Sequence, residues 1–498
     1  MRDSGNREIE LKFKLDPARA DAIVVHLCPG VALVSRKLES IYFDTPDQAL
    51  RKAGCTLRVR EDGGRWTQTV KTPWGGESAG RGEWESAVDG DAPDPAWVQH
   101  TPAGVALGDR VLERLFTVSV DRRSFMLESS GGAVEVSLDH GTAIRADRSV
   151  AFDELELELK SGEPAVLFDL AARLRTAFAL RPGFTTKADR GFALIDAKPS
   201  GRHFEAPGLT RKMTAGEAFT AIAWSALKQI ADNAEELRSC SRAEVVHQMR
   251  VGARRLQCTL VTFEPIIADR SMEGITTELK WLSSEFDAAR NLDVFLAGPL
   301  GRSSRLTPCK AEMAGVRRQL LMAREGAYAS ARAAVESDRF SALLLNVLAW
   351  IEVGPWKAEN AGGRVLRDGP IGDFAAHALE KATRRVRKRG RHFDHLSTEE
   401  RHKLRIRAKT LRYAADVFDG LFAKRAGRAR RFLAVTKALL DCLGELNDIA
   451  TGEGLIADSA LPRRLTELQA AREKRLIGEA RGALEQFGQV KRFWRKRS

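Results

Sequence analysis

Cysteine is scarce in this sequence, and its cysteines do not have the spacing that metal sites use. The six cysteines among 498 residues are scattered and form no Cys-x-x-Cys pair, which excludes the usual zinc-binding patterns. Scattered thiols without a disulfide framework are typical of reduced cytoplasmic proteins. We therefore predict a cytoplasmic protein whose cysteines are mostly small core residues.

Long apolar runs are absent as well. The sequence contains no run of about 18 apolar residues, the length of a membrane-spanning helix. Met1-Arg2-Asp3 leads straight into a strand-like segment, so we expect no signal peptide. With 43% hydrophobic and 30% charged residues, the composition is that of a globular protein without a membrane partner. The length predicts about two to four domains.

Negative charge is depleted in the second part of the chain. Residues 1–200 hold 27 Lys and Arg against 31 Asp and Glu, whereas the remaining residues hold 53 against 36. The whole basic excess of +13 therefore belongs to the C-terminal part. Such an asymmetry predicts two parts with different tasks, the second of which involves a polyanion.

The first part has the alternation of β-strands. Charged and apolar residues alternate in Glu8–Leu15, and Phe152–Lys160 repeats this pattern with three glutamates. Because the side-chain period of a strand is two, the charged residues of each segment share one face. Turn-forming residues separate several such runs, which predicts a barrel or a sandwich. The expected strands are Glu8–Leu15, Leu38–Asp44, Thr56–Glu61, Trp66–Lys71, Gly80–Val88, Leu115–Leu127, Ala133–Ile144 and Phe152–Lys160, with helices at Pro17–Leu27 and Pro164–Phe178.

Charged residues recur on one face of several predicted strands. Arg58 and Arg60 share a face, and Lys71 lies beside threonines on the next strand. A solvated sheet face would explain one such strand, but five of them favour a polar lumen with an apolar exterior. Arg and Lys bind phosphate oxygens, and clustered carboxylates hold Mg²⁺ or Mn²⁺. This combination suits phosphoryl transfer.

From about Thr214 onward, apolar residues follow the three- and four-residue spacing of helices. Proline-containing breaks, such as Glu264-Pro265, separate the helical segments. The clearest segments are Ala215–Glu236, Ser241–Phe263, Met272–Leu296 and Arg430–Leu446. Helical bundles are the expected result.

Two motifs are repeated within this helical part. The motif that begins at His247 recurs at His402, 155 residues later, and the motif that begins at Phe286 recurs at Leu443 with an offset of 157. Near-constant offsets predict a duplicated bundle. The matched motifs are His247-x-x-Arg250-Val251-x-x-Arg254 with His402-x-x-Arg405-Ile406-x-x-Lys409, and Phe286-Asp287-x-x-Arg290-Asn291 with Leu443-Gly444-x-x-Asn447-Asp448.

The first motif places a basic row on one helix face in each repeat. The spacing i, i+3 and i+7 makes each row about two turns long. A solvated basic face would explain one row, but two rows and the basic run Arg384–Arg391 favour polyanion binding. Aromatic residues are not interleaved with these rows, which argues against nucleic acid as the partner.

The first part also resembles a known family, the CYTH superfamily of triphosphate tunnel enzymes. Glu8-x-Glu10-x-Lys12 is similar to its ExExK signature, and further matches follow in the family's order over about residues 6–195. The resemblance implies an eight-stranded antiparallel tunnel barrel that binds triphosphate compounds with a divalent metal ion, Mg²⁺ or Mn²⁺. The further matches are Tyr42-Phe43-Asp44-Thr45, Arg58-x-Arg60, Lys71, Arg81-x-Glu83-x-Glu85, Asp139, Glu154/Glu156/Glu158 and Thr186-Lys187-Ala188-x-Arg190-Gly191.

This resemblance implies roles for individual residues. The metal ligands would be Glu8, Glu10, Asp139, Glu154 and Glu156. The phosphate-binding cations would be Lys12, Arg58, Arg60, Lys71, Arg122 and Lys187. Two choices stay open: Glu158 has the same facing as Glu154 and Glu156, and simple alternation favours Arg123 where the family pattern favours Arg122. We find no Ser/His/Asp or Cys/His set, so we expect no protein nucleophile, and a metal-activated water would attack.

The family includes inorganic triphosphatases, thiamine triphosphatases and class IV adenylate cyclases. Bacterial cyclases resemble one another in a His-Phe pair shortly before ExExK, and residues 2–7 contain none. Thiamine would need a pocket for its rings, whereas we expect Trp66, Trp74 and Trp84 to be packing residues. The resemblance therefore favours hydrolysis of inorganic triphosphate to pyrophosphate and phosphate. The alternatives are a thiamine triphosphatase, a class IV adenylate cyclase, or a polyphosphate-binding scaffold with a sensor barrel.

The second part resembles the CHAD domain over about residues 211–497. The resemblance implies two related helical bundles and a basic surface that binds inorganic polyphosphate, with polyphosphate granules as a place of association. Asn291 departs from the family, because an aspartate often stands there. The implied polyphosphate-binding residues are His247, Arg250, Arg254, His402, Arg405, Lys409 and Arg412.

The fold class that these observations predict is an α+β multidomain protein. Residues 1–200 would form the tunnel barrel and residues 201–213 a linker. Residues 214–498 would form the all-α domain, with its two repeats at about 214–350 and 370–498.

Overall fold

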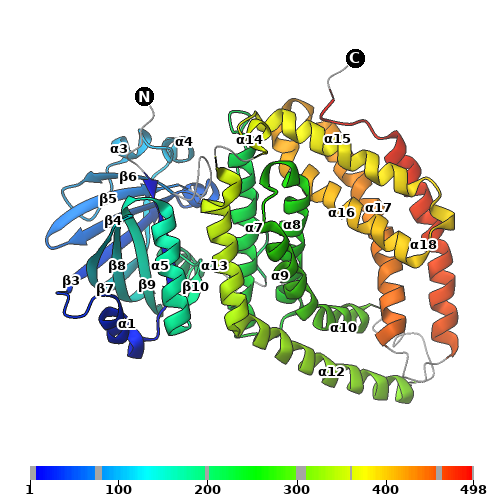
Figure 1. The fold of residues 1–498 in the computed structure, drawn as a ribbon, viewed down its shortest axis with the longest axis horizontal. Helices are drawn as coiled ribbons and strands as arrows, with labels where there is room; N and C mark the ends of the chain where they lie inside the picture. The colour runs from blue at the N-terminus through cyan, green and yellow to red at the C-terminus, as the bar shows by residue number, and fades with distance from the viewer. Residues whose placement is uncertain are drawn as a thin grey trace. The chain divides into compact units, whose positions relative to one another are not determined.

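The computed structural model of the chain describes residues 7–72, 81–196, 201–298, 310–358, 362–455 and 463–495. The chain divides into two compact units (Figure 1). The first comprises residues 1–200 with 341–353, and the second comprises residues 201–340 with 354–498. The predicted combination of an antiparallel sheet domain and an all-α domain is confirmed.

The described part of the first unit contains one ten-stranded sheet. Every neighbouring pair in it is antiparallel, in the order β1-β6-β5-β4-β3-β7-β8-β9-β2-β10. The strands are β1 (Arg7–Glu8), β2 (Glu10–Lys14), β3 (Val34–Asp44), β4 (Thr56–Asp62), β5 (Arg65–Lys71), β6 (Arg81–Ala87), β7 (Glu113–Ser129), β8 (Gly132–Arg145), β9 (Arg148–Gly162) and β10 (Arg181–Gly183).

One N-terminal stretch pairs with both ends of this strand order. β1 pairs with β6, and β2 pairs with β9 after the single intervening residue Ile9. β1 is only two residues long. Its pairing with β6 is therefore too short to close the sheet along the full length of β6. The predicted strand Glu8–Leu15 is therefore divided between two neighbours. That division and the unpredicted β10 explain why ten strands are described where eight were expected.

Apolar side chains cover the outer face of the sheet. Ile41, Leu57, Val59 and Val70 pack with Val98 and neighbouring residues in one buried cluster. Burial of each aliphatic side chain of this kind stabilises the folded state by about 1.5–3 kcal/mol. The helices of the unit are η1 (Pro17–Arg19), α1 (Ala20–Leu27), α2 (Ala49–Lys52), α3 (Pro95–Gln99), α4 (Gly104–Leu107), α5 (Pro164–Phe178) and α6 (Lys187–Ala193). The predicted apolar exterior is present where α2, α3 and α4 pack.

The inner face is apolar where α6 packs on it. Phe116, Val118 and Val120 of β7 form a buried cluster with residues of α6, including Phe192. Gly191 is required for this contact, because a Cβ at this position would lie 2.0 Å from the Phe116 ring. The predicted polar lumen therefore extends over only part of the inner face.

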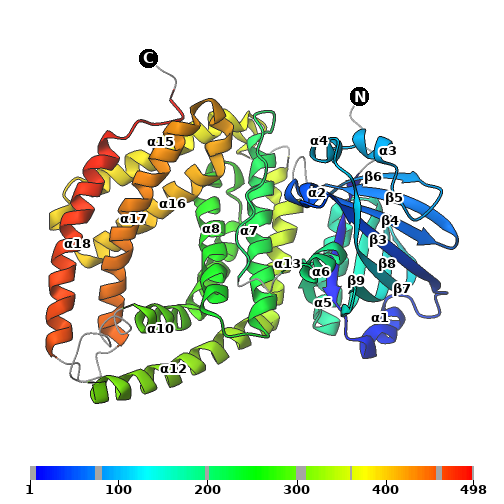
Figure 2. The same cartoon turned by 180° about the vertical axis from the view of Figure 1, so that it is seen from behind.

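The second unit consists of helices (Figures 1 and 2). Capping boxes begin α7 at Thr214 and α16 at Ser397, as expected for a hydroxyl N-cap followed by Glu at the third helical position. The helices are α7 (Ala215–Leu237), α8 (Ala243–Ile267), α9 (Met272–Glu285), α10 (Asp287–Ala297), α12 (Lys310–Glu336), α14 (Arg364–Arg367), α15 (Ile371–Gly390), α16 (Thr398–Phe418), α17 (Ala426–Leu455) and α18 (Arg463–Gln489), with short η2 (Pro355–Lys357), η3 (Phe393–His395) and η4 (Asp419–Arg425). α13 (Asp338–Val353) spans a boundary between the two units.

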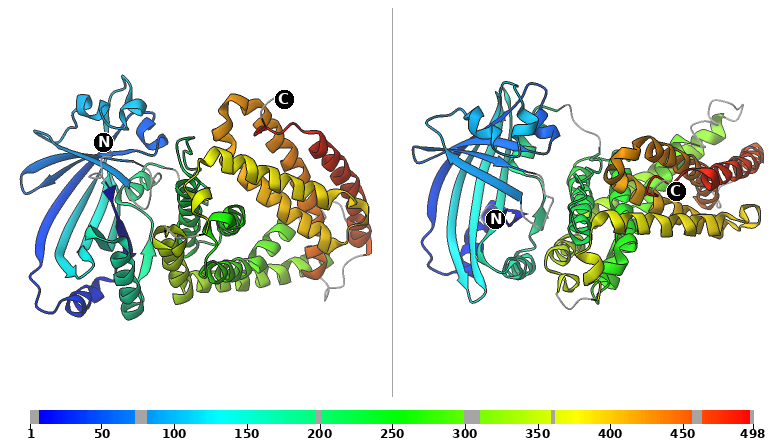
Figure 3. Two further views of the ribbon diagram at one scale, coloured as in Figure 1. Left: turned by 45° about the horizontal axis from the view of Figure 1, so that its top comes forward. Right: turned by 90° about the horizontal axis from the view of Figure 1, so that it is seen from above.

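The two repeats have corresponding helix contacts. α7 packs on α8 and α15 packs on α16, while α10 packs on α12 and α17 packs on α18, and Figure 3 shows α17 and α18 side by side. In addition, α8 of the first repeat packs directly on α16 of the second. This contact brings the two copies of the repeated basic motif to one place.

Two of the predicted helix limits in this unit were wrong. The predicted helix Met272–Leu296 is divided at Phe286 into α9 and α10. The predicted break at Pro265 is also absent, because α8 continues to Ile267 with the proline inside its last turn. None of the described helices combines the length and apolarity needed to cross a membrane.

Candidate active site and basic cluster

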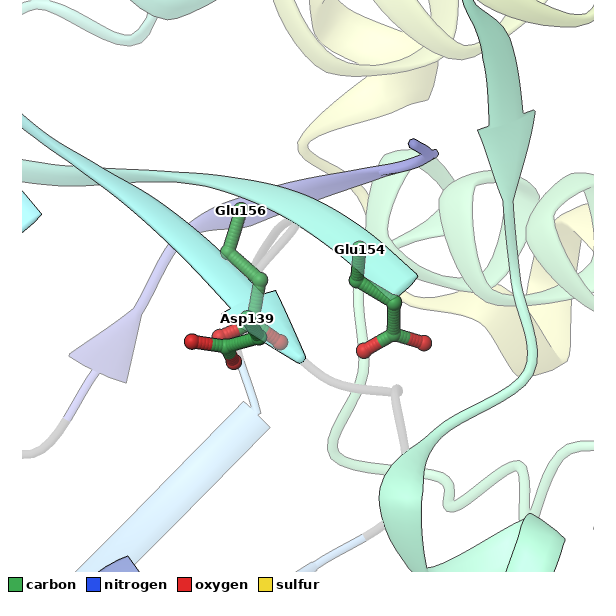
Figure 4. Close-up of side chains that lie close together, drawn as sticks. All are labelled: Asp139, Glu154 and Glu156. Carbon is green, nitrogen blue, oxygen red and sulfur yellow. The ribbon is translucent and has the colours of Figure 1, made fainter. Parts of the chain in front are cut away.

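Three buried carboxylates lie close together in the first unit. Asp139 belongs to β8, and Glu154 and Glu156 belong to β9. Asp139 is the register partner of Glu154, and Glu156 shares their face because strand side chains alternate. One oxygen atom from each carboxylate lies within 4.8 Å of the others (Figure 4). Because all three residues are buried, their charges require partners.

Lys187 contacts all three of these carboxylates. Its Nζ lies 2.6 Å from Glu156 Oε1, 2.8 Å from Asp139 Oδ2 and 3.4 Å from Glu154 Oε2. A capping box at Thr186 begins α6, so Lys187 is the first residue of this helix. The cap therefore holds the backbone from which the lysine side chain extends.

Three further cations contact the same carboxylates. Arg122 donates two hydrogen bonds of 2.7 Å to Asp139 and one to Glu156. Lys12 donates to Glu156 at 2.7 Å, and Arg190 donates to Glu154. Within the described residues, four cations thus surround three carboxylates.

These charges stabilise one another. Burial alone would raise the pKa of Glu156, but Lys12 and Lys187 outweigh it and hold this pKa well below its ordinary value. Burial alone would lower the pKa of Lys187, but Glu156 and Asp139 raise it above its ordinary value. Burial alone would also lower the pKa of Lys12, but nearby carboxylates, Glu10 most strongly, raise it above its ordinary value. These groups are therefore ionised at neutral pH.

A cavity of about 340 Å³ lies on the inner side of the sheet, and Glu156 lines it. All six cations that the sequence predicts to bind phosphate also line this cavity. They are Lys12, Arg58, Arg60, Lys71, Arg122 and Lys187. The geometry thus brings cations from β2, β4, β5, β7 and α6 around one space.

Positive charge is crowded on the β4 side of the cavity. Burial and the neighbouring charge of Arg58 lower the pKa of Arg60 to about 10. Arg60 Nε donates to the neutral hydroxyl of Ser40 at 3.1 Å, whereas Lys71 Nζ lies 3.1 Å from a carboxylate oxygen of Glu83. Buried cations that raise one another's energy are a feature of anion-binding sites.

The three carboxylates fit a divalent metal ion. Carboxylate oxygens are the hard ligands that Mg²⁺ and Mn²⁺ prefer. Glu154 Oε2 is buried and accepts no hydrogen bond from the described residues; Lys187 Nζ lies 3.4 Å from it, so this oxygen keeps lone pairs with which it could bind a metal ion. Asp139, Glu154 and Glu156 could therefore form a metal centre.

In the second unit, the basic rows of the two repeats lie in one cluster. Arg250 and Arg254 belong to α8, and Arg405 and Lys409 belong to α16, which packs on α8. Burial and the three arginines lower the pKa of Lys409 to about 7. We call Arg250, Arg254, Arg405 and Lys409 the basic cluster.

Acidic residues neutralise this cluster only in part. Asp287 Oδ1 lies 2.5 Å from Arg250 Nη2, and Asp448 is close enough to raise the pKa of Arg405, although burial outweighs it and the pKa is lowered. Arg405 Nε is buried without a hydrogen-bond acceptor among the described residues. The cluster therefore has the features of an anion-binding site.

Comparison with known families assigns both units. Residues 6–192 match the model of the CYTH domain, and residues 221–457 match that of the CHAD domain. This chain combines a CYTH domain with a CHAD domain. The resemblance found in the sequence is thereby confirmed: the CYTH limits are close to the predicted 6–195, whereas the CHAD match ends 40 residues before the predicted limit of 497.

Several relatives share one or both domains. The inorganic triphosphatase of Haemophilus influenzae is 28% identical over 193 residues, which cover 38% of this chain and 55% of that protein. The chain thus matches about half the length of this relative. An uncharacterized protein of Mycobacterium tuberculosis is 25% identical over 452 residues, or 83% of each chain. The crystal structure of the CHAD domain from Ricinus communis is 24% identical with a TM-score of 0.47, and covers 57% of this chain and 96% of that one.

Of the two remaining predicted metal ligands of the CYTH domain, only Glu10 has a described side chain, and it is not part of the three-carboxylate cluster. Glu10 lines the cavity, where its Oε1 lies 3.0 Å from Lys12 Nζ. The side chain of Glu8 lies outside the described residues. Glu158, whose role was open, lies 2.6 Å from Lys160 Nζ rather than in the described cluster.

The open choice between two arginines has a geometric answer. Arg122 lines the cavity, whereas Arg123 Nη1 donates to Asp21 Oδ1 at 2.9 Å outside it. Simple alternation favoured Arg123 because it assumed that the polar residues before it face the lumen. In the structure the apolar residues that alternate with them, Phe116, Val118 and Val120, face inward instead and pack against α6.

Arg190 is a site residue to which the sequence assigned no role. It belongs to the Thr186–Gly191 motif, and its guanidinium donates to Glu154. Lys187 and Arg190 are three residues apart, a spacing that places both on one face of a helix. Prediction of α6 would have revealed the second cation.

The remaining predicted residues of the CHAD domain have mixed positions. His247 lies beside the basic cluster, where burial and Arg290 lower its pKa to about 4. Arg290 is thus a neighbour that was not predicted to bind polyphosphate. His402 Nδ1 lies 2.7 Å from Asn447 Oδ1 at an exposed position. The charge of Arg412 acts on its neighbour Tyr413, as does the charge of Arg254 in the basic cluster.

Proposed function

We propose that the CYTH domain is a metal-dependent triphosphatase that hydrolyses inorganic triphosphate to pyrophosphate and phosphate. The observation that carries this proposal is that all six predicted phosphate-binding cations line one cavity beside three buried carboxylates. The similarity to the inorganic triphosphatase of Haemophilus influenzae supports it. The chemistry needs a polyanion and a hard divalent ion in one site, and these residues can bind both.

The cations would bind and orient the phosphate chain. Arg58 and Arg60 present planar donors suited to two phosphate oxygens at once, and Lys71 adds a point charge beside them. The lowered pKa of Arg60 would return toward its ordinary value when an anion enters, so binding would relieve the mutual repulsion. Lys12, Arg122 and Lys187 would contact phosphate from the carboxylate side.

The carboxylates would hold the metal ion. Asp139, Glu154 and Glu156 would supply its ligands, with Glu10, which lines the cavity, and Glu8 as further candidates. A bound Mg²⁺ or Mn²⁺ would polarise phosphate oxygens and make an attacking water more acidic. The chain's own contribution is to align the phosphate chain and to neutralise the charge that develops on the leaving pyrophosphate.

The lining of the cavity favours inorganic triphosphate over substrates with rings. Tyr42 is the single aromatic residue among those described in the lining. Trp66 and Trp84 pack instead with the apolar cluster on the outer face, and Trp74 lies outside the described residues. The described lining therefore has no pair of aromatic rings to hold a thiazolium ring or a nucleobase.

For the CHAD domain, we propose that the basic cluster binds inorganic polyphosphate. Four cations from two helices lie together, and the Nε atom of Arg405 is a buried donor without an acceptor among the described residues. A flexible chain of phosphates could contact several of these cations at once, which suits a linear polyanion better than an isolated anion. Each domain would thus bind phosphoanhydride chains, the first to cleave them and the second to retain them.

Phosphate release by the full chain tests the proposed activity. Inorganic triphosphate, thiamine triphosphate, ATP and long-chain polyphosphate would be compared with Mg²⁺, with Mn²⁺ and with EDTA. We expect turnover of inorganic triphosphate to exceed the others at least tenfold and to stop in EDTA. Faster turnover of thiamine triphosphate or ATP would contradict the substrate assignment. Binding without turnover of any substrate would support the alternative of a sensor barrel.

A further inference from the structure

Lys187 has a relationship to the carboxylate cluster that no other described cation shares. Its Nζ contacts one oxygen of each of Asp139, Glu154 and Glu156. Arg122 contacts two of these carboxylates, while Lys12 contacts one. The Lys187 ammonium therefore lies at the point on which the three carboxylates converge.

A divalent ion bound to the same oxygens would conflict with this ammonium. An ion bound to Glu156 Oε1 at about 2.1 Å, from which Lys187 Nζ is 2.6 Å distant, would lie no more than about 4.7 Å from Nζ. The two positive charges of the ion and the one of the ammonium repel each other strongly at this separation in a buried site. Glu156 Oε1 already accepts from Lys12 and Lys187, and Asp139 Oδ2 is shared by Arg122 and Lys187, so neither oxygen has a free lone pair for a metal ion while Lys187 stays in place. Lysine and metal ion therefore compete for one position.

The cavity offers the Lys187 ammonium a second position. Its side chain lines the cavity as well as contacting the cluster, and its backbone is held by the capping box at Thr186. Rotation about the flexible four-carbon stem can therefore move Nζ toward the cavity while α6 stays in place. In the cavity the ammonium would meet the phosphate chain of the proposed substrate.

We propose that Lys187 is a displaceable counter-ion that limits metal affinity and turns to the phosphate chain when a divalent ion enters the carboxylate cluster. This inference rests on the proposed metal-dependent function. It assigns one residue to two consecutive tasks: the neutralisation of the carboxylates and the binding of phosphate. Without a metal ion, the lysine keeps the three buried carboxylates ionised and ordered, which pre-organises the site.

Direct measurement of Mn²⁺ binding tests this competition without any turnover. Titration of the full chain with Mn²⁺, followed by the electron paramagnetic resonance signal of the free ion, would compare wild type with Lys187→Met. We expect Lys187→Met to bind Mn²⁺ at least tenfold more tightly, because the competitor and one positive charge are removed. Affinity that is unchanged or weaker in Lys187→Met would overturn the proposal.

Lys71→Met is the matched control. Lys71 also lines the cavity, but its Nζ contacts Glu83 at 3.1 Å and is not among the cations described on the cluster. The same loss of charge should therefore change Mn²⁺ affinity by less than threefold. An equal gain in both variants would show a general effect of net charge and would overturn the specific role of Lys187.

Acylation of lysines in wild type tests the displacement without a mutation. The full chain would be treated briefly with an amine-acylating reagent with and without Mn²⁺, and peptides would be quantified by mass spectrometry. We expect Mn²⁺ to raise acylation of Lys187 at least threefold relative to Lys71. Unchanged or reduced labelling would contradict the exchange. If Mn²⁺ binds and triphosphate is hydrolysed but both tests fail, the inference fails while the proposed function stands.

Discussion

Arg122 donates two hydrogen bonds of 2.7 Å to Asp139, its register partner across β7 and β8. The planar guanidinium and the buried carboxylate thus hold one another in a fixed orientation. A third hydrogen bond joins Arg122 to Glu156. Arg122 therefore links the carboxylate cluster to the cavity that it lines.

Arg122→Ala should impair hydrolysis of inorganic triphosphate severely. Loss of a donor that neutralises developing charge in a buried site typically reduces kcat by about 100-fold, and we expect a loss of this size in kcat/KM. Arg123→Ala is the control, because Arg123 contacts the exposed Asp21 and should retain at least half of the activity. Comparable losses in both variants would contradict the placement of Arg122. Steady-state phosphate release measures both.

Glu156→Gln should destabilise the inner strands of the CYTH domain. Glu156 is the shared partner of Lys12, Lys187 and Arg122, and removal of one charge from a buried ionic network costs about 3–5 kcal/mol. Hydrogen exchange of β8 and β9 peptides, measured by mass spectrometry, would report the free energy of local opening. Glu135→Gln, whose partner Lys160 is partly exposed, should cost less than about 1 kcal/mol. Equal protection in wild type and Glu156→Gln would count against the network.

Polyphosphate binding should depend on the basic cluster rather than on net charge. Replacement of Arg250, Arg254 and Arg405 by Ala should weaken binding of long-chain polyphosphate at least 50-fold, because these cations are partly desolvated. Replacement of Arg384, Arg385 and Lys388 by Ala removes the same charge from exposed positions, where salt screens it. We expect less than a threefold loss there. Isothermal titration at constant ionic strength distinguishes the two, and equal losses would refute a specific cluster.

Polyphosphate affinity should fall as the pH rises above 7. Burial and neighbouring arginines lower the pKa of Lys409 to about 7, so Lys409 is charged below this pH and increasingly neutral above it. A bound polyanion favours the charged form, so binding above pH 7 requires proton uptake. The charged and titratable groups that face Lys409 are Arg250, Arg254, Cys258 and His247 on α8, Arg405 on α16 and Asp448 on α17.

Fluorescence titration with labelled polyphosphate at pH 6.5 and pH 8.5 checks this linkage. Wild type should lose about tenfold in affinity over this range. Lys409→Arg, which remains charged throughout, should lose less than twofold, and it also controls for titration of the polyphosphate itself. A pH dependence that persists unchanged in Lys409→Arg would show that another group carries it.

Much of the CYTH site was predictable from local alternation. Glu154 and Glu156 share a face with period two, and Arg58 and Arg60 do the same, so single strands reveal which charges point together. Alternation failed for β7, because the inward residues Phe116 and Val118 are apolar. Which face of a strand points inward depends on what packs there, and α6 comes from a distant part of the chain.

The basic cluster of the CHAD domain was predictable only in its parts. The spacing of Arg250 and Arg254 revealed a row on one helix, and the repeat revealed a second row around Arg405. Their union depends on packing of α8 against α16, a contact between segments about 155 residues apart. Arg290 joins from α10, and no helical spacing connects it with the other rows. The joining of the two rows therefore depends on tertiary contacts, which the repeated motifs alone could not reveal.

The central claim is that three buried carboxylates support metal-dependent hydrolysis of inorganic triphosphate. The most direct test is phosphate release from inorganic triphosphate by the full chain with Mn²⁺, compared between Glu154→Gln and Glu128→Gln. Glu154 belongs to the cluster, whereas Glu128 is exposed at the end of β7. We predict that Glu154→Gln loses at least 1,000-fold in kcat, about 4 kcal/mol, and that Glu128→Gln matches wild type. Near-normal turnover by a folded Glu154→Gln protein would contradict the claim.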